Sequence, residues 1–130
     1  MKRAGIFLFF DPQGLVDDYI VECLTSLREY LDEILVVSNS PLDDTARERL
    51  LKGATEVFER ENTGFDVGGY RDGIARFGWD RLGQIDELIL FNYTFFAPVN
   101  PWKNLFDRVD AAGAVDFWGI TEHDEVRPHP

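Results

Sequence analysis

The feature that most constrains the fold is an alternation of short, continuously apolar runs with segments of helical periodicity. Residues Gly5 to Phe10 are apolar throughout and are followed by the turn signal Asp11-Pro12-Gln13-Gly14, as expected for a strand buried on both faces of a sheet. From Leu15 to Leu31 the apolar residues recur at helical spacing, and acidic residues occupy the first turn, where the helix dipole favours them. The chain is therefore predicted to begin with a strand and a helix.

The same alternation continues along the chain. Further strands are predicted at Glu33–Ser38, Thr55–Glu59, Asp86–Phe91 and Val115–Ile120, and further helices at Leu42–Leu51, Gly68–Phe77 and Trp102–Ala111. Asp43 or Asp44 is the expected N-cap of the second helix. Strands that alternate with helices at this spacing predict right-handed crossovers. The predicted fold class is α/β, a Rossmann-like, mostly parallel sheet with helices on both faces.

The size of the chain predicts one domain. With 130 residues, 45% of them hydrophobic, the chain can close one core, and a second domain would be too small to bury its own interior. Residues 1–130 are therefore taken as a single domain. Its last residues are polar and punctuated by proline, with no closing helix, as in a fragment of a longer domain.

Charge and cysteine content restrict the partners and the compartment. The chain has 13 basic and 24 acidic residues and a formal charge of −11, which repels nucleic acid and acidic membrane surfaces. Lys2 and Arg3 precede an apolar run, but Asp11-Pro12 ends the run too early for a signal peptide, and direct membrane insertion is not expected. The single cysteine, Cys23, cannot form an internal disulfide. A cytoplasmic location is expected, with any contact to the inner face of the membrane made through partners.

A glycine-rich stretch after the third predicted strand carries the most functional information. Between Glu61 and Gly73 there are four glycines, and each glycine inside a helix costs about 0.8–1 kcal/mol relative to alanine. Three kinds of interaction would offset that cost: close approach to a ligand, capture of an anion by main-chain N–H groups, or tight packing of the helix on a neighbour. Arg71 adds a charge able to bind a diphosphate with two donors.

An ordinary structural explanation of this stretch is equally open. Gly64 would have a positive φ, Asp66 would cap the helix, and Arg71 would pair with a surface carboxylate. The spacing is neither that of the dinucleotide-binding fingerprint nor that of a P-loop. A phosphate site is therefore one of two hypotheses at this point.

Other candidates lie on loops that follow the predicted strands, where open α/β sheets bind ligands. The candidate nucleotide-sugar-binding residues are Asp11, Asn39, Asn62, Gly64, Asp66, Gly68, Gly69, Arg71, Asp72 and Asn92. Asp11 and Asn39 are also typical turn residues, and Asp72 is also typical of a solvated surface. Glu122 or His123, after the last predicted strand, is a candidate catalytic base, although a charge run of this kind is often only solvated. Phe95 and Phe96 either stack on a sugar ring or fill the core, and Trp118 is predicted to lie in the core.

Several stretches, in order along the chain, resemble the rhamnan synthesis protein F family. They are Phe10–Gly14 with Val16–Tyr19, Val37–Leu42, Glu61–Gly73, Glu87–Asn92, Phe95–Pro98 and Asp116–Thr121. The resemblance implies the nucleotide-binding half of a GT-A type glycosyltransferase, which makes rhamnose-containing polysaccharide at the cytoplasmic side of the membrane. The implied donor is dTDP-L-rhamnose, with Mg or Mn as cofactor, and the implied acceptor is a polysaccharide or a lipid-linked sugar.

One departure from the family pattern concerns the metal. The family has an aspartate after the position of Asn92, whereas this chain continues Tyr93-Thr94. Mg²⁺ usually takes one or two carboxylates together with substrate phosphates, and tyrosine does not replace one. The metal ligands are therefore not identified, and a non-catalytic nucleotide-sugar-binding or assembly module is the alternative to a glycosyltransferase. An NAD-dependent oxidoreductase is disfavoured by the glycine spacing.

Overall fold

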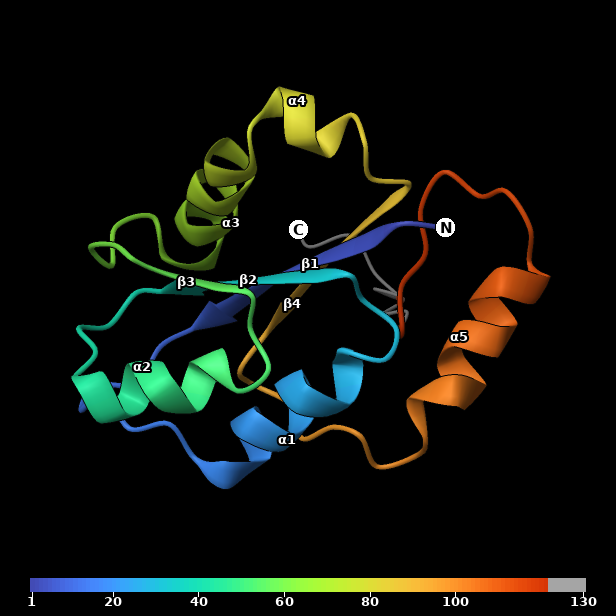
Figure 1. Cartoon of the computed structure of the whole chain (residues 1–130). Coiled ribbons are helices and arrows are strands. Elements are labelled where there is room, and N and C mark those ends of the chain that lie inside the picture. The colour runs from blue at the N-terminus through green and yellow to red at the C-terminus, as the bar shows by residue number, and fades with distance from the viewer. Residues whose placement is uncertain (122–130) are drawn as a thin grey trace, which may run out of the picture.

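The computed structural model describes residues 1–121, which form a central sheet between two layers of helices (Figure 1). The elements, in chain order, are β1 (Arg3–Phe9), α1 (Asp18–Leu27), β2 (Glu33–Ser38), α2 (Asp44–Leu51), β3 (Glu56–Glu59), α3 (Phe65–Phe77), α4 (Trp79–Leu82), β4 (Glu87–Asn92) and α5 (Trp102–Ala111). Helices α1 and α2 cover one face of the sheet, and α3 covers the other (Figure 1). None of the helices described for these residues is long and apolar enough to cross a membrane.

The sheet has four strands in the order β3-β2-β1-β4, and every pairing is parallel. Strand β1 is central, because Ile6 pairs with Leu35 of β2 on one side and with Leu90 of β4 on the other. All seven residues of β1 are buried, as its continuous apolar sequence predicts. The predicted α/β class with a parallel sheet is confirmed.

The core has two parts, one on each face of the sheet, because successive side chains of a strand point to opposite faces. Phe7 and Phe9 of β1 pack on the α1 side, where Leu24 is fully buried and Phe106 of α5 joins the cluster. Ile6 and Leu8 point to the other face, in the cluster that also holds Phe77 of α3. The sheet is thus anchored to a helical layer on each face.

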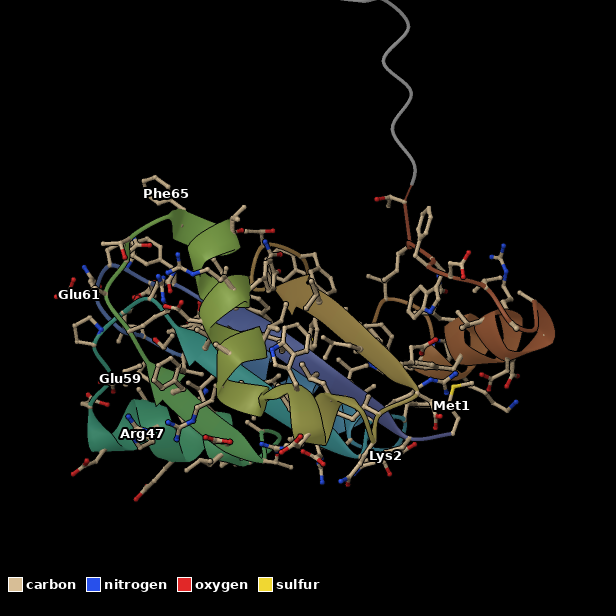
Figure 2. All side chains as sticks on the ribbon, turned by 90° about the horizontal axis from the view of Figure 1, so that it is seen from above. Met1, Lys2, Arg47, Glu59, Glu61 and Phe65 are labelled. Atoms are coloured by element: carbon tan, nitrogen blue, oxygen red, sulfur yellow. The ribbon has the colours of Figure 1, made fainter. Side chains whose placement is uncertain are left out.

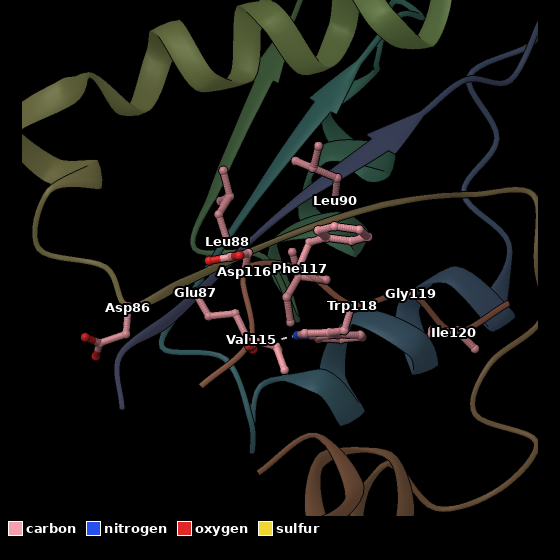
Figure 3. Close-up of a pocket in the computed structure, with 11 residues that line it drawn as sticks. Asp86, Glu87, Leu88, Leu90, Val115, Asp116, Phe117, Trp118, Gly119 and Ile120 are labelled. Atoms are coloured by element: carbon pink, nitrogen blue, oxygen red, sulfur yellow. Dashed lines mark hydrogen bonds between the residues drawn. The ribbon is translucent and has the colours of Figure 1, made fainter. Parts of the chain in front are cut away.

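One predicted strand is absent. Residues 115–120 form no strand, although they lie along β4 (Figure 3). Phe117 and Ile120 are 89% and 63% exposed, so their apolar side chains find no second layer to pack on. Trp118, predicted to be in the core, is only half-buried, and its Nε1 donates to Glu87 Oε2 at 2.8 Å.

The helix boundaries differ from the predictions for local reasons. Helix α1 begins three residues late, because the carboxylate of Asp11 accepts hydrogen bonds from the amides of Gln13 and Leu15 and holds that segment as a loop. Helix α3 begins early, at Phe65, after Gly64 turns the chain through a φ of 69°. Of the two candidate caps of α2, Asp43 is the N-cap, and its side chain accepts from the amide of Ala46 at 2.7 Å.

Cys23 is expected to be unreactive in the folded protein. The thiol lies on the buried face of α1, its residue is 3% exposed, and burial raises its pKa to about 12. The thiolate is the reactive species, so at pH 8 a disulfide reagent such as DTNB should label Cys23 only at the rate of unfolding. Labelling of the native protein at the rate measured in denaturant would contradict this burial.

Candidate functional site

The loops that follow the four strands meet at one edge of the sheet. Because all strands are parallel, their carboxyl ends share this edge, which is where open α/β sheets bind ligands. The loops after β1 and β2 bring Asp11 and Asn39 to this edge, and Asn92 ends β4. The loop after β3 leads into α3, and Phe65 at its end points away from the rest of the molecule (Figure 2).

An arginine that the sequence analysis did not select organises this edge. The side chain of Arg60, directly after β3, is only 5% exposed. Its Nε donates to Asp72 Oδ2 at 2.7 Å, its Nη1 to Asn39 Oδ1 at 2.8 Å and its Nη2 to the carbonyl of Thr63 at 2.7 Å. Arg60 therefore joins the loop after β2, its own loop and helix α3.

Asn39 extends this network to the start of the helix. The residue is 4% exposed, and its Nδ2 donates to Asn62 Oδ1 at 3.1 Å and to the carbonyl of Phe65 at 3.2 Å. Three predicted binding residues, Asn39, Asn62 and Asp72, are thus bonded within the protein. In this arrangement they fix the shape of the loop between β3 and α3.

Main-chain amides without a partner occur one turn earlier than predicted. The amide of Gly68, expected to be free, donates to the carbonyl of Gly64 at 2.9 Å. Among the described residues, the amides of Phe65, Asp66 and Val67 have no hydrogen-bond acceptor, as is usual for the first turn of a helix. These three N–H groups and the positive end of the helix dipole suit a negatively charged group.

Packing accounts for three of the four glycines. A Cβ on Gly68 would lie 2.3 Å from the carbonyl oxygen of Thr63, and one on Gly69 would lie 2.2 Å from Cδ1 of Leu8. A Cβ on Gly73 would lie 2.9 Å from Cγ2 of Ile6. Of the three explanations offered for the glycine cost, tight packing of α3 on the sheet and on its own loop is the one the geometry supports at these positions.

The two charged candidates on α3 have different surroundings. Asp66 does not cap the helix, because Gly64 is the N-cap and no side chain caps it; instead Asp66 Oδ2 accepts from Asn92 Nδ2 at 3.2 Å. Arg71 is 76% exposed and pairs with Asp72, Nη2 to Oδ1, at 3.0 Å. Of the two hypotheses from the sequence, the surface ion pair is the one that the structure shows for Arg71.

The remaining candidate residues have different surroundings. Asp11 has the turn role that the sequence left open, since its Oδ2 accepts from two amides of its own loop. The predicted catalytic residues Glu122 and His123 lie outside the described residues. Phe95 packs against the core, whereas Phe96 is 72% exposed.

A divalent metal at this edge would need several oxygen ligands. In residues 1–121 no group of three or more His, Cys, Asp or Glu side chains is placed to hold a metal ion. Asp66 is the carboxylate that the structure places against Asn92. A metal held by protein ligands alone does not fit this edge.

The ionisation of Asp72 should report on the Arg60 network. Hydrogen bonds from Arg60, and then from Arg71, hold the pKa of Asp72 below its ordinary value of 3.8. A lowered folded-state pKa means that this contribution to stability is complete above the unfolded-state pKa and is lost as the pH falls through the folded-state pKa. An NMR titration should find Asp72 titrating below pH 3.8, and Arg60→Met should raise that pKa. An unchanged pKa in the variant would contradict the pairing.

The fold is a parallel α/β domain, and the carboxyl ends of its strands share the edge where open sheets of this class bind ligands. The chain belongs to the rhamnan synthesis protein F family, which matches residues 34–130, so the resemblance seen in the sequence is confirmed. The chain is also 31% identical over 104 residues to the protein named "Uncharacterized protein y4gN" of Sinorhizobium fredii (strain NBRC 101917 / NGR234). That match covers 80% of this chain and 27% of the relative, so the chain spans about a quarter of the relative's length. No solved structure matches the chain.

Proposed function

We propose that this chain is the nucleotide-binding half of a GT-A type glycosyltransferase that uses dTDP-L-rhamnose to build rhamnose-containing polysaccharide at the cytoplasmic side of the membrane. Membership of the rhamnan synthesis protein F family supports a role in rhamnan synthesis. The observation that carries the proposal is the group of three unpaired amides, Phe65 to Val67, at the carboxyl edge of the parallel sheet. A diphosphate is the part of the donor that such a group would bind.

The Arg60 network would make this site rigid before the ligand arrives. Arg60 and Asn39 together hold the carbonyls of Thr63 and Phe65, and these flank the turn that aims the amides. Donors fixed in advance stabilise a developing charge without further reorganisation. In transfer, a hydroxyl of the acceptor would form a bond to the anomeric carbon while the bond from that carbon to the diphosphate breaks.

The transfer releases a proton from the acceptor hydroxyl and leaves negative charge on the diphosphate. The acceptor's proton would pass to a base, for which Glu122 and His123 remain the candidates from the sequence. The leaving diphosphate would gain charge at the amides of α3, with the exposed Arg71 one turn further along the helix. When bound, Mg or Mn would neutralise diphosphate charge, with Asp66 as the available carboxylate.

Calorimetry with dTDP tests the site directly. Val67→Pro removes one unpaired amide at a position in the first helical turn, where proline costs no helical hydrogen bond. A hydrogen bond to a charged group contributes about 1.5–3 kcal/mol, so this variant should bind dTDP at least about tenfold more weakly. Val67→Ala keeps the amide and loses only a side chain that is 80% exposed. Equal affinities of the two variants, or no binding by the parent chain, would contradict the proposal.

A non-catalytic nucleotide-sugar-binding or assembly module is the second candidate. It is favoured by Asn92-Tyr93-Thr94, where the family pattern has an aspartate and this chain has none. The full-length parent protein should be assayed for release of dTDP from dTDP-L-rhamnose with acceptor and with Mg²⁺ or Mn²⁺. Binding without release of dTDP would favour this second candidate, and release would favour the transferase.

A further inference from the structure

A small cavity lies at the same edge of the sheet but on the α1 side. Its volume is about 230 Å³. The end of β1, the start of α1 and the residue after β4 line it, with Phe10, Asp11, Leu15, Asp17, Tyr19 and Tyr93 among the lining residues. Ligand pockets for larger molecules span roughly 300–1,000 Å³. A cavity of this size holds one ring rather than a whole nucleotide sugar.

Asp17 in this cavity has an unused carboxylate. It is the N-cap of α1, yet its side chain accepts no hydrogen bond from the helix. Asp43, at the same position of α2, caps its helix in the ordinary way. Among the described residues Asp17 has no side-chain hydrogen bond and no ion pair, so both of its oxygens can accept from a ligand.

Aromatic rings form the walls. The ring of Tyr93 lies 6.3 Å from that of Phe9 and 6.4 Å from that of Phe10. The hydroxyl of Tyr19 donates to the carbonyl of Tyr93 at 3.1 Å, and burial, followed by the charge of Asp17, raises the pKa of Tyr19. The exposed ring of Phe96 extends this surface, 4.6 Å from the ring of Tyr19.

The chemistry of the cavity selects against phosphate and for a polyhydroxylated ring. In the described part of the chain no lysine or arginine lines it, and carboxylates there repel an anion. Carboxylates accept hydrogen bonds and donate none, and Oδ2 of Asp11 already accepts from two amides of its own loop. The ligand must therefore supply the donors, chiefly to Asp17. A sugar has several hydroxyls and apolar C–H faces that pack on aromatic rings, whereas the thymine base of dTDP has one N–H and two carbonyls.

This cavity and the proposed diphosphate site share the end of β4. Asn92 bonds to Asp66 at the start of α3, and the next residue, Tyr93, packs with the cluster on the α1 side. A ligand in each site would therefore approach the same segment from opposite faces of the sheet. An acceptor placed in this way could reach a donor bound at α3.

We propose that this cavity binds one neutral sugar ring of the acceptor, with Asp17 as its hydrogen-bond acceptor and the rings of Tyr19 and Tyr93 as its packing surface. The assignment to the acceptor rests on the proposed transferase function. Binding of a neutral sugar at the cavity does not depend on it.

NMR of the ¹⁵N-labelled chain, titrated with methyl α-L-rhamnopyranoside, tests this. The sugar should shift the amide signals of Asp17–Ile20 and of Tyr93 and Thr94 in a saturable way. Asp17→Asn keeps an N-cap residue of equal quality and removes the charge, and it should weaken the sugar at least about tenfold. Asp44→Asn, in the first turn of α2 and away from the cavity, is the matched control and should leave the affinity unchanged.

Three results would overturn the inference. They are shifts scattered over the surface, equal affinities of the parent and Asp17→Asn, and a cavity that responds to thymidine but not to the sugar. A separate titration with dTDP, followed at Phe65–Val67, distinguishes the two proposals. If dTDP leaves the signals of Phe65–Val67 unchanged while the sugar still shifts those at the cavity, the diphosphate proposal is wrong and the sugar proposal stands.

Discussion

Replacing Arg60 with methionine is expected to lower the free energy of unfolding by about 2–4 kcal/mol and to abolish dTDP binding. Methionine keeps much of the apolar length but none of the donors, so the side chain of Asn39 and the carbonyl of Thr63 lose their partner. Asn39 is 4% exposed, and a buried acceptor left unpaired costs about 1–3 kcal/mol. Loss of the ion pair between Arg60 and Asp72 adds to this cost. Chemical denaturation followed by circular dichroism gives the first quantity, and calorimetry gives the second.

Arg71→Met is the matched control for this experiment. Arg71 pairs with the same carboxylate, Asp72, but its side chain is 76% exposed rather than 5%. Exposed ion pairs contribute about 0–1 kcal/mol, so this variant should unfold almost as the parent does. If both variants lose the same free energy of unfolding, the buried hydrogen bonds of Arg60 do not stabilise the loop more than an exposed ion pair does, which contradicts the role given to Arg60.

The second large effect is expected for Gly68→Ala. Alanine would gain up to about 1 kcal/mol of helix propensity, but its Cβ would lie 2.3 Å from a main-chain oxygen, that of Thr63. That oxygen cannot move easily, because it also accepts from Arg60. Overpacking typically costs about 1–3 kcal/mol, and a contact of 2.3 Å with a main-chain atom belongs near the upper end of that range. After the gain in helix propensity, the net result is a loss of about 1–2 kcal/mol in thermal or chemical unfolding, together with weaker dTDP binding.

Gly119→Ala is the control for the glycine prediction. Gly119 has no positive φ, and the nearest atom to its added Cβ is 3.5 Å away. A surface substitution of this kind changes stability by no more than about 0.5 kcal/mol. If the Gly68→Ala variant is as stable as the parent, the loop relaxes around the methyl group, and the close contact with the Thr63 carbonyl does not exclude a side chain at this position.

The strands and their parallel arrangement could be predicted because burial on both faces leaves a simple mark in the sequence. Gly5–Phe10 and Glu33–Ser38 are continuously apolar or nearly so, and the structure places strands there. The same mark misled at Val115–Ile120, since an apolar run becomes a strand only where a neighbour pairs with it and a layer covers it. Asp116 and Gly119 also interrupt this segment, and both residue types are depleted in strands.

The position of the candidate site in the fold was predictable from the sequence, whereas the contacts of its residues were not. Parallel topology brings the polar loops to one edge, and this follows from the order of the elements. Which residues bond to one another there depends on contacts between distant positions, such as Arg60 with Asn39, 21 residues apart. No spacing rule reveals such a pair, although an arginine directly after a strand in a strongly acidic chain was a usable signal. For the same reason the free amides were expected at Gly68 and occur at Phe65–Val67.

A crystal structure of the chain with dTDP is the sharpest test of the proposed diphosphate site. An oxygen of the diphosphate should lie within hydrogen-bond distance of at least two of the amides of Phe65, Asp66 and Val67, with the Arg60 network unchanged. A diphosphate bound elsewhere, while those three amides face only water, would contradict this proposal.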